Sequence, residues 1–170
     1  MTTAHPVILV VNAGSSSVKI SIFSVPEAAH EDVEVLPAQL AHGQIECIGV
    51  APHIEGRLAD GTVVADERFP VEQVPDHDAA FRLIQARLQE GLRDTPPVAI
   101  GHRVVHGGMD FADAVRIDDN VIAKLDALVP LAPLHQPHNL TAIRAVRAAA
   151  PDLLQVACFD TAFHAGHDPM

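Results

Sequence analysis

A continuous hydrophobic run near the start of the chain constrains the fold more than any other feature. Residues 7–11 read Val-Ile-Leu-Val-Val, a β-branched and aliphatic pattern typical of a strand that is buried on both faces. A polar turn rich in glycine and serine follows, and then Val18, Ile20 and Ile22 recur at every second position. The chain is therefore expected to begin with a β-hairpin whose turn is polar.

Strand and helix patterns alternate along the rest of the chain. Residues 26–37 are expected to form a loop rich in proline, alanine and glutamate, and Asp60-Gly61 predicts a second hairpin turn. A helix is predicted over residues 76–93, where aliphatic residues recur at helical spacing after two aspartates. The other predicted strands are 39–50, 54–58, 62–69, 98–105 and 153–159, and the other predicted helices are 118–129 and 137–150. This order predicts one α/β domain with a mixed sheet, opened by antiparallel hairpins and flanked by helices.

The turn between the first two predicted strands carries the side chains that a phosphate group needs. Gly14 allows close backbone approach, Ser15 and Ser17 offer hydroxyl donors, Asn12 offers an amide and Lys19 a positive charge. A Walker-type P-loop requires a second glycine directly before its lysine and a helix after it, whereas here a strand follows the lysine. The turn instead resembles the phosphate-binding hairpin of the actin, hexokinase and sugar-kinase fold. The alternative interpretation is a polar turn with a solvated lysine.

Three more segments place chemically capable side chains next to the ends of predicted elements. Arg103 lies at the end of a predicted strand, where ligands meet open α/β sheets, and its planar fork suits carboxylate or phosphoryl oxygens. A structural ion pair is the alternative. His135 lies between apolar neighbours, so a core histidine bonded to the backbone is the alternative there. Asp160 follows the last predicted strand, where it could equally cap a turn.

The composition argues against nucleic acid and membranes as partners. The chain has 11 basic and 22 acidic residues among 170, a formal charge of -11, and no tryptophan or tyrosine. Neither a basic patch nor a base-stacking platform is predicted, and the longest apolar run, residues 127–134, is too short to span a bilayer. Cys47 and Cys158 lie in apolar stretches without metal-like spacing, and no leader pattern opens the chain. A reducing cytoplasm is the expected location.

Together the four polar segments resemble the acetate kinase family, from residue 7 to residue 164 and in the family's order. The matching motifs read Asn-Ala-Gly-Ser-Ser-Ser-Val-Lys, His-Arg-Val-Val-His-Gly-Gly, Leu-Ala-Pro-Leu-His and Phe-Asp-Thr-Ala-Phe-His. The resemblance implies a ribonuclease-H-like sheet of the actin/hexokinase type. It also implies reversible transfer of the γ-phosphoryl group of ATP to acetate, which gives acetyl phosphate and ADP, with Mg²⁺ as the metal. Propionate or butyrate kinase of the same family is the alternative.

The same resemblance assigns roles to individual residues. It implies that Arg103 binds the acyl substrate and phosphoryl group, that His135 lies beside the phosphate path, and that Asp160 is the catalytic acid/base residue. It further implies that Asn12 contributes to the Mg²⁺ site. The residues implied to contact ATP and its phosphates are Gly14, Ser15, Ser17 and Lys19.

Those roles can be weighed against the chemistry of a carboxylate substrate. A carboxylate is already an adequate nucleophile at neutral pH, so alignment and charge screening matter more than activation. Arg103 could supply the screening. Since the substrate has no proton to lose, we expect Asp160 to position Arg103 or to orient water on Mg²⁺ rather than to act as a base.

Two departures from the family pattern and the chain length bear on what this chain does. Met109 and Gln136 stand where glutamate and asparagine are usual, but neither replaces a matched functional residue. Family members are more than twice as long, so residues 1–170 are expected to be the N-terminal substrate and phosphate domain of a truncated or fragmentary acetate kinase, without the C-terminal nucleotide domain. The chain alone is then expected to be inactive. A non-catalytic module that binds phosphate or acetate, or a purely structural fragment, are the alternatives.

The expected partners follow from the same resemblance. They are acetate or another short-chain carboxylate and ATP or ADP, and the full-length enzyme is expected to be a homodimer. Because the missing domain covers apolar surface in the family, this chain is expected to expose a hydrophobic face near Asp160 and to self-associate through it.

Overall fold

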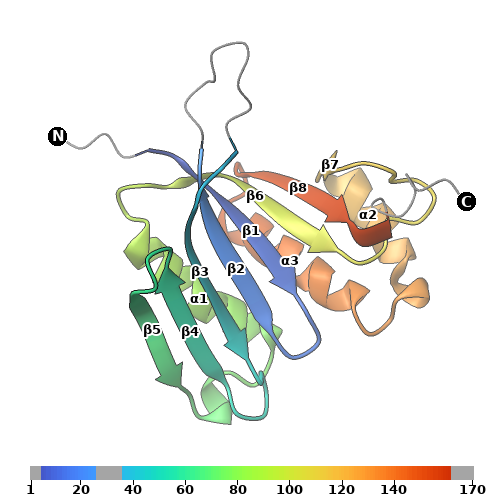
Figure 1. Ribbon diagram of the computed structural model, residues 1–170. Helices are drawn as coiled ribbons and strands as arrows, with labels where there is room; N and C mark the ends of the chain where they lie inside the picture. The colour runs from blue at the N-terminus through green and yellow to red at the C-terminus, as the bar shows by residue number, and fades with distance from the viewer. Residues whose placement is uncertain (1–4, 26–35, 162–170) are drawn as a thin grey trace, which may run out of the picture.

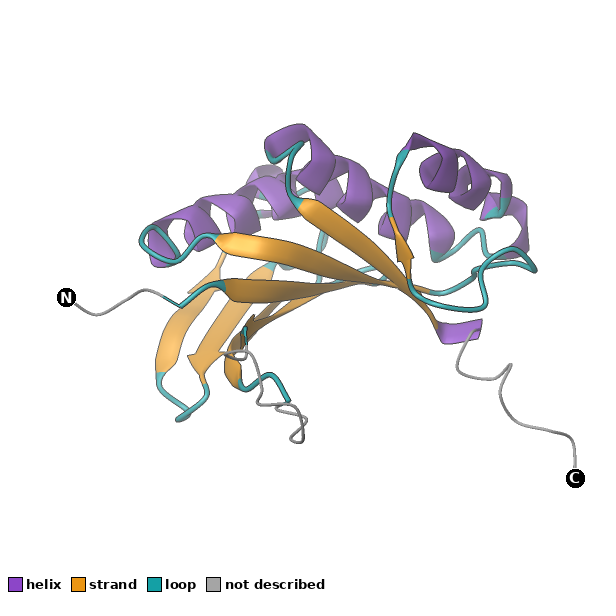
Figure 2. Cartoon of the chain, turned by 90° about the horizontal axis from the view of Figure 1, so that it is seen from above, coloured by secondary structure: helices purple, strands orange, loops and turns teal. Residues whose placement is uncertain are grey.

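The computed structural model describes residues 5–25 and 36–161, and these form an eight-stranded mixed sheet with its helices on one side (Figures 1 and 2). The strand order is β5-β4-β3-β2-β1-β6-β8-β7. The strands are β1 (Val7–Ala13), β2 (Val18–Ser24), β3 (Gln39–Glu46), β4 (His53–Leu58), β5 (Val63–Arg68), β6 (Pro97–Val104), β7 (Val115–Arg116) and β8 (Leu154–Phe159). The helices are α1 (His77–Gly91), α2 (Asp119–Ala127) and α3 (Gln136–Ala149), with 3₁₀ turns at Val71–Gln73 and Val129–Leu131.

The sheet has an antiparallel half and a parallel centre. Strands β1 to β5 pair as successive antiparallel neighbours, which confirms the predicted opening by hairpins. Strand β1 also pairs in parallel with β6, and β6 pairs in parallel with β8. Because parallel strands end at the same edge, the carboxyl ends of β1, β6 and β8 lie together. The mixed α/β architecture predicted from the sequence is therefore confirmed.

The expectation that strand β1 is buried on both faces is wrong. Val7, Leu9, Val11 and Ala13 are buried against the helices, whereas Val10 on the opposite face is 38% exposed. Alternate residues of a strand point to opposite faces, and α1, α2 and α3 cover only one of them (Figure 2). The sheet therefore has one covered face and one open face within the described part of the chain.

Two hydrophobic clusters fill the space between the sheet and the helices. The first joins β1, β2 and β3 to α1, and the second joins β6 and β8 to α2 and α3. Helices α1 and α2 begin where the sequence indicates. The side chains of their N-cap residues, Asp76 and Asp118, accept hydrogen bonds from Ala79 N and Val121 N at 2.8 Å. Within the described residues, no helix is both long and apolar enough to cross a bilayer.

Several predicted boundaries need correction. The predicted strand 39–50 ends at Glu46, because Cys47 and Gly49 have positive φ angles of 53° and 76°, which depart from the extended backbone of a strand. The short strand β7 and the 3₁₀ turn Val129–Leu131 were not predicted. Cys47 and Cys158 are exposed rather than enclosed by their apolar neighbours. Residues 26–35 of the predicted loop lie outside the described residues.

Candidate functional site

Three predicted site residues meet on the open face, where β1, β6 and β8 end. Arg103 Nε donates to Asp160 Oδ1 at 2.9 Å, and Arg103 Nη2 donates to Asp160 Oδ2 at 2.6 Å. Arg103 Nη1 donates to Asn12 Oδ1 at 3.1 Å. One planar guanidinium group thus bonds both Asp160 and Asn12, and Asn12 lies 91 positions before Arg103 in the sequence. Arg103 and Asp160 side chains remain 48% and 37% exposed, so a small anion can reach them.

Strand register explains why these side chains share a face. The buried residues of β6 are Ile100, His102 and Val104, so Arg103 between them must point to the open face. Asn12 lies opposite Lys19 in the β1–β2 ladder, which places the lysine on the same face. Lys19 is exposed and forms no hydrogen bond or ion pair with any residue in the described ranges. The lysine is therefore a free positive charge on the open face, one strand away from β1.

The turn itself is compact and presents its serines to solvent. Gly14 N donates to Ser17 O at 2.8 Å, while Ser15 and Ser16 are exposed. A Cβ atom added at Gly14 would lie 3.5 Å from Ser17 Oγ, an ordinary contact. The protein's own atoms therefore do not require glycine here. The open space that Gly14 leaves lies beside the Ser17 hydroxyl, where a phosphate could approach.

Two residues that the sequence analysis did not single out hold the turn in place. Asn139 Nδ2 donates to Ala13 O at 2.9 Å, and its Oδ1 accepts from Val105 N at 3.1 Å. His77 Nε2 donates to Gly14 O at 2.7 Å. Two consecutive carbonyl groups of the turn are thus fixed from α1 and α3. No local signal predicts these contacts, since they span 126 and 63 residues of sequence.

His135 lies beside this support rather than in the core. It is exposed at the first turn of α3, so the core-histidine alternative is wrong. His77 stacks on His138 with ring centroids 4.2 Å apart. Burial lowers the pKa of His138, and the neighbouring His77 and His135 lower it further. Three imidazoles therefore gather next to the turn at residues 14–17, and His77 and His135 disfavour protonation of His138.

These side chains can bind an anion and screen its charge, but the guanidinium of Arg103 already donates to Asp160 and Asn12. A carboxylate or phosphoryl group that binds Arg103 must share the fork with Asp160 and Asn12. The oxygens of Asn12 and Asp160 are of the kind that Mg²⁺ prefers, which fits the implied metal. Both now face the guanidinium, so a direct Mg²⁺ bond to Asn12 requires Arg103 to release that oxygen.

Two cavities of the described structure lie away from Arg103. The larger, about 740 Å³, is an apolar space between α1 and the covered face of β2 to β4. A shallower depression of about 410 Å³ lies on the open face and is lined by Lys19, His42, Glu55 and Arg57 among others. Residues 162–164 of the Phe-Asp-Thr-Ala-Phe-His motif lie outside the described residues. Asn12, Arg103 and Asp160 therefore lie on an open surface at the carboxyl ends of the central strands.

Comparison with known proteins places the chain in a family. Residues 7–169 match the acetokinase family model. The acetate kinase of Nitrobacter hamburgensis is 49% identical over 161 residues, which cover 95% of this chain and 38% of that protein. Crystal structures of a Porphyromonas gingivalis acetate kinase and a Francisella tularensis propionate kinase are each 32% identical, with TM-scores of 0.78 and 0.76. Each alignment covers 96% of this chain and 39% of the other.

These matches also confirm the predicted fold class, because the structural neighbours are actin/hexokinase-like ATPases that share this mixed sheet. The chain spans well under half the length of the relatives that it matches. Motif order, fold and sequence identity agree, and the chain belongs to the acetokinase family.

Proposed function

We propose that this chain is the substrate and phosphate domain of an acetate kinase, which transfers the γ-phosphoryl group of ATP reversibly to acetate. One observation carries the proposal: Arg103 is held between Asn12 and Asp160 at the joint end of three strands, on the same face as Lys19. That geometry presents a fixed guanidinium fork to an anion while a free ammonium lies nearby. Two anionic reactants need such screening before they can meet.

Arg103 acts in this proposal as the group that aligns the acyl carboxylate with the phosphoryl group. The N–H groups of Nη1 and Nη2 that Asp160 and Asn12 do not use can donate to the oxygens of a carboxylate, and the positive charge offsets the repulsion between acetate and phosphate. The hydroxyls of Ser15 and Ser17 and the ammonium of Lys19 hold phosphate oxygens of ATP. His135 lies at the start of α3, from where it reaches the phosphate path.

Asp160 acts as a positioning residue for Arg103. Its two oxygens accept from Nε and Nη2 of the guanidinium, so the plane of the fork is set by the carboxylate. Bound Mg²⁺ supplies charge neutralisation for the phosphates. Asn12 and Asp160 would hold it, through water for as long as Arg103 bonds their oxygens.

Propionate kinase is the second candidate, since a propionate kinase structure matches this chain as completely as an acetate kinase structure does. Butyrate kinase remains a further alternative within the family. In either case the partners are a short-chain carboxylate and ATP or ADP. The enzyme acts in the cytoplasm, and its full-length form is a homodimer. We expect no phosphoryl transfer by the 170 residues alone, because the nucleotide domain belongs to the rest of the enzyme.

Titration of the ¹⁵N-labelled chain with acetyl phosphate, followed by NMR, tests the proposal. The expected result is saturable shifts of the Arg103 Nε–H and of the backbone amides of Ser15 and Ser17. Arg103→Gln should abolish the shifts in the turn. Arg87→Gln is the matched control, because Arg87 also forms an exposed carboxylate pair, with Glu67, but lies on α1.

Two outcomes would contradict the proposal. Absence of any saturable shift would favour a purely structural fragment. Shifts that persist in Arg103→Gln would place anion binding elsewhere. A parallel assay for acetyl phosphate, with ATP, acetate and Mg²⁺, addresses catalysis, and turnover by the chain alone would refute its dependence on a second domain.

A further inference from the structure

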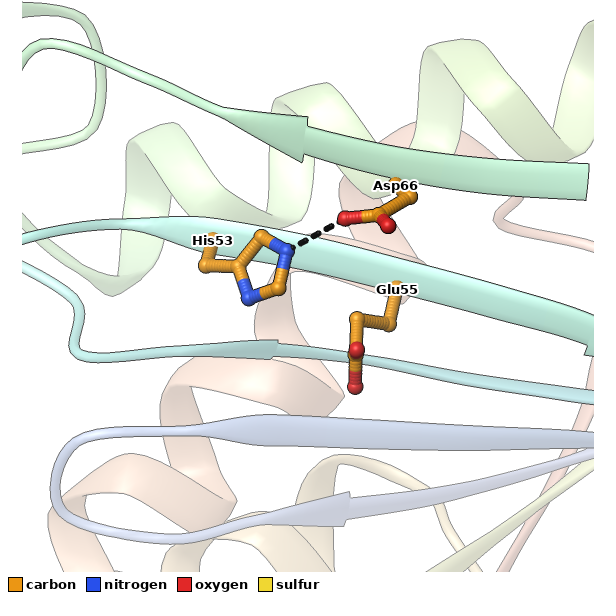
Figure 3. A group of neighbouring side chains, drawn as sticks. All are labelled: His53, Glu55 and Asp66. Atoms are coloured by element: carbon orange, nitrogen blue, oxygen red, sulfur yellow. Dashed lines mark hydrogen bonds and ion pairs between the residues drawn. The ribbon is translucent and has the colours of Figure 1, made fainter. Parts of the chain in front are cut away.

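A second group of polar side chains lies on the open face of the sheet, in β4 and β5. His53 and Glu55 are two residues apart in β4, so they share a face, and Asp66 of β5 lies opposite Glu55 in register. One ligand atom from each of the three lies within 4.8 Å of the others. Figure 3 shows both carboxylates on the same side of the imidazole ring. Strands β2 and β3 separate this group from the end of β1 that carries Asn12.

His53 is the anchor of the group. Its side chain is only 9% exposed, and Nε2 donates to Asp66 Oδ1 at 2.7 Å. On the other side of the ring, Nδ1 lies 3.7 Å from Glu46 Oε1. The second oxygen of Glu46 accepts from Gln44 Nε2 at 3.2 Å, which orients the carboxylate. An imidazole with a carboxylate near each nitrogen needs either a second proton or a metal ion at one of the two nitrogens.

The charge around His53 is not balanced by direct contacts. Glu55 makes no hydrogen bond or ion pair with any residue of the described segments. Its carboxylate nevertheless lies beside that of Asp66. Two adjacent carboxylates therefore face one space.

We propose that His53, Glu55 and Asp66 bind a divalent transition-metal ion of the zinc type. One imidazole nitrogen with two carboxylate oxygens is a ligand set that suits Zn²⁺ and related ions, whereas Mg²⁺ prefers oxygen alone. The metal takes the place of the proton on Nε2, and that proton moves to Nδ1. Nδ1–H then faces Glu46 Oε1, 3.7 Å away, and a small rotation of Glu46 would let it accept as the outer carboxylate that commonly orients a metal-bound histidine.

The site needs only small side-chain movements to close. Tetrahedral zinc ligands at about 2.1 Å from the ion lie about 3.4 Å from one another. The three ligand atoms are now up to 4.8 Å apart, and Asp66 is exposed while Glu55 is half-buried, so both carboxylates can rotate. The bound ion would join β5, the edge strand of the sheet, to β4. We therefore expect it to stabilise this edge, independently of phosphoryl transfer.

Calorimetric titration of the 170-residue chain with ZnCl₂ tests the proposal. The expected result is a site of one ion per chain that His53→Gln abolishes and Glu55→Gln weakens at least about tenfold. His42→Gln is the matched control and should leave this site intact, because His42 is an exposed histidine of the neighbouring strand β3. Zinc should also raise the unfolding temperature of the wild-type chain and of His42→Gln, but not that of His53→Gln.

The outcomes separate a metal site from a protonated histidine between carboxylates. Absence of a zinc site in the wild-type chain would refute the proposal, as would zinc binding that neither His53→Gln nor Glu55→Gln weakens. If His53→Gln fails to fold, Glu55→Gln decides the question, since Glu55 has no bond to lose in the described structure. A zinc-dependent shift of the His53 Nε2 ¹⁵N resonance in the wild-type chain would support direct ligation.

Discussion

Lowering the pH should destabilise this protein through His102, the buried neighbour of Arg103 on β6. His102 is 2% exposed, its Nε2 lies 2.8 Å from Gln155 Oε1, and its Nδ1 has no partner among the described atoms. Burial lowers the pKa of His102 to about 4, although the hydrogen bond to Gln155 opposes the shift. In the unfolded chain the same group has an ordinary pKa of about 6.5.

The unfolded chain therefore binds a proton before the folded one does. The stability that neutral His102 contributes is complete above about pH 6.5 and is lost as the pH falls toward 4. From the two pKa values, lowering the pH from about 7.5 to about 5 should reduce the free energy of unfolding by about 2 kcal/mol. Urea denaturation at the two pH values, followed by circular dichroism, measures this difference.

His102→Gln separates this effect from that of other titrating groups. Glutamine can still donate to Gln155 but cannot titrate, so the variant should lose about 2 kcal/mol less than the wild type over the same pH range. His42→Gln, at an exposed position, should keep the wild-type dependence. If the free energy of unfolding depends on pH equally in the wild type and in His102→Gln, the prediction is wrong, because the buried neutral imidazole of His102 would then not cause the loss of stability.

Three further predictions concern Asn139, a pair of glycines and Asp160. Asn139→Ala removes both hydrogen bonds that hold the ends of β1 and β6, and should lower the free energy of unfolding by about 2–4 kcal/mol in urea denaturation. Gly108 has a φ of 65°, and a Cβ added there would lie 2.9 Å from the Leu128 side chain, so Gly108→Ala should lower the free energy of unfolding by more than about 1 kcal/mol. Gly61→Ala should lower it less, because Gly61 has a φ of 87° but open space around it. An equal cost for the two glycines would contradict that comparison. Because Asp160 sets the plane of the Arg103 guanidinium, Asp160→Asn should weaken inorganic phosphate binding about threefold or more in an NMR titration, whereas tighter binding would show that Asp160 mainly neutralises the charge of Arg103.

Local sequence patterns predicted most elements because each strand or helix carries its own periodicity. The alternation at Val18, Ile20 and Ile22 and the caps at Asp76 and Asp118 depend only on neighbouring residues. Predictions failed where a single residue departs from the expected backbone. The positive φ of Cys47, which is not a glycine, ends β3 four residues before the predicted boundary. No hydrophobic pattern reveals that conformation.

The motifs predicted that Asn12, Arg103 and Asp160 lie at the ends of strands, where an α/β sheet exposes chemistry, and the structure brings these three side chains together. The sequence could not show that Arg103 bonds both Asn12 and Asp160, since these contacts span 91 and 57 residues and depend on the parallel pairing of β6 with β1 and β8. Nor could it show that His135 is exposed.

The sequence by itself thus determined most of the elements, the family resemblance and the list of candidate site residues. Tertiary structure alone decided which face of the sheet the helices cover, that His77 and Asn139 hold the phosphate turn, and that His53 meets Asp66. The physical reason is that periodicity and capping act within a few residues. Strand register and helix packing, in contrast, are set by the joint burial of surfaces that lie far apart in the chain.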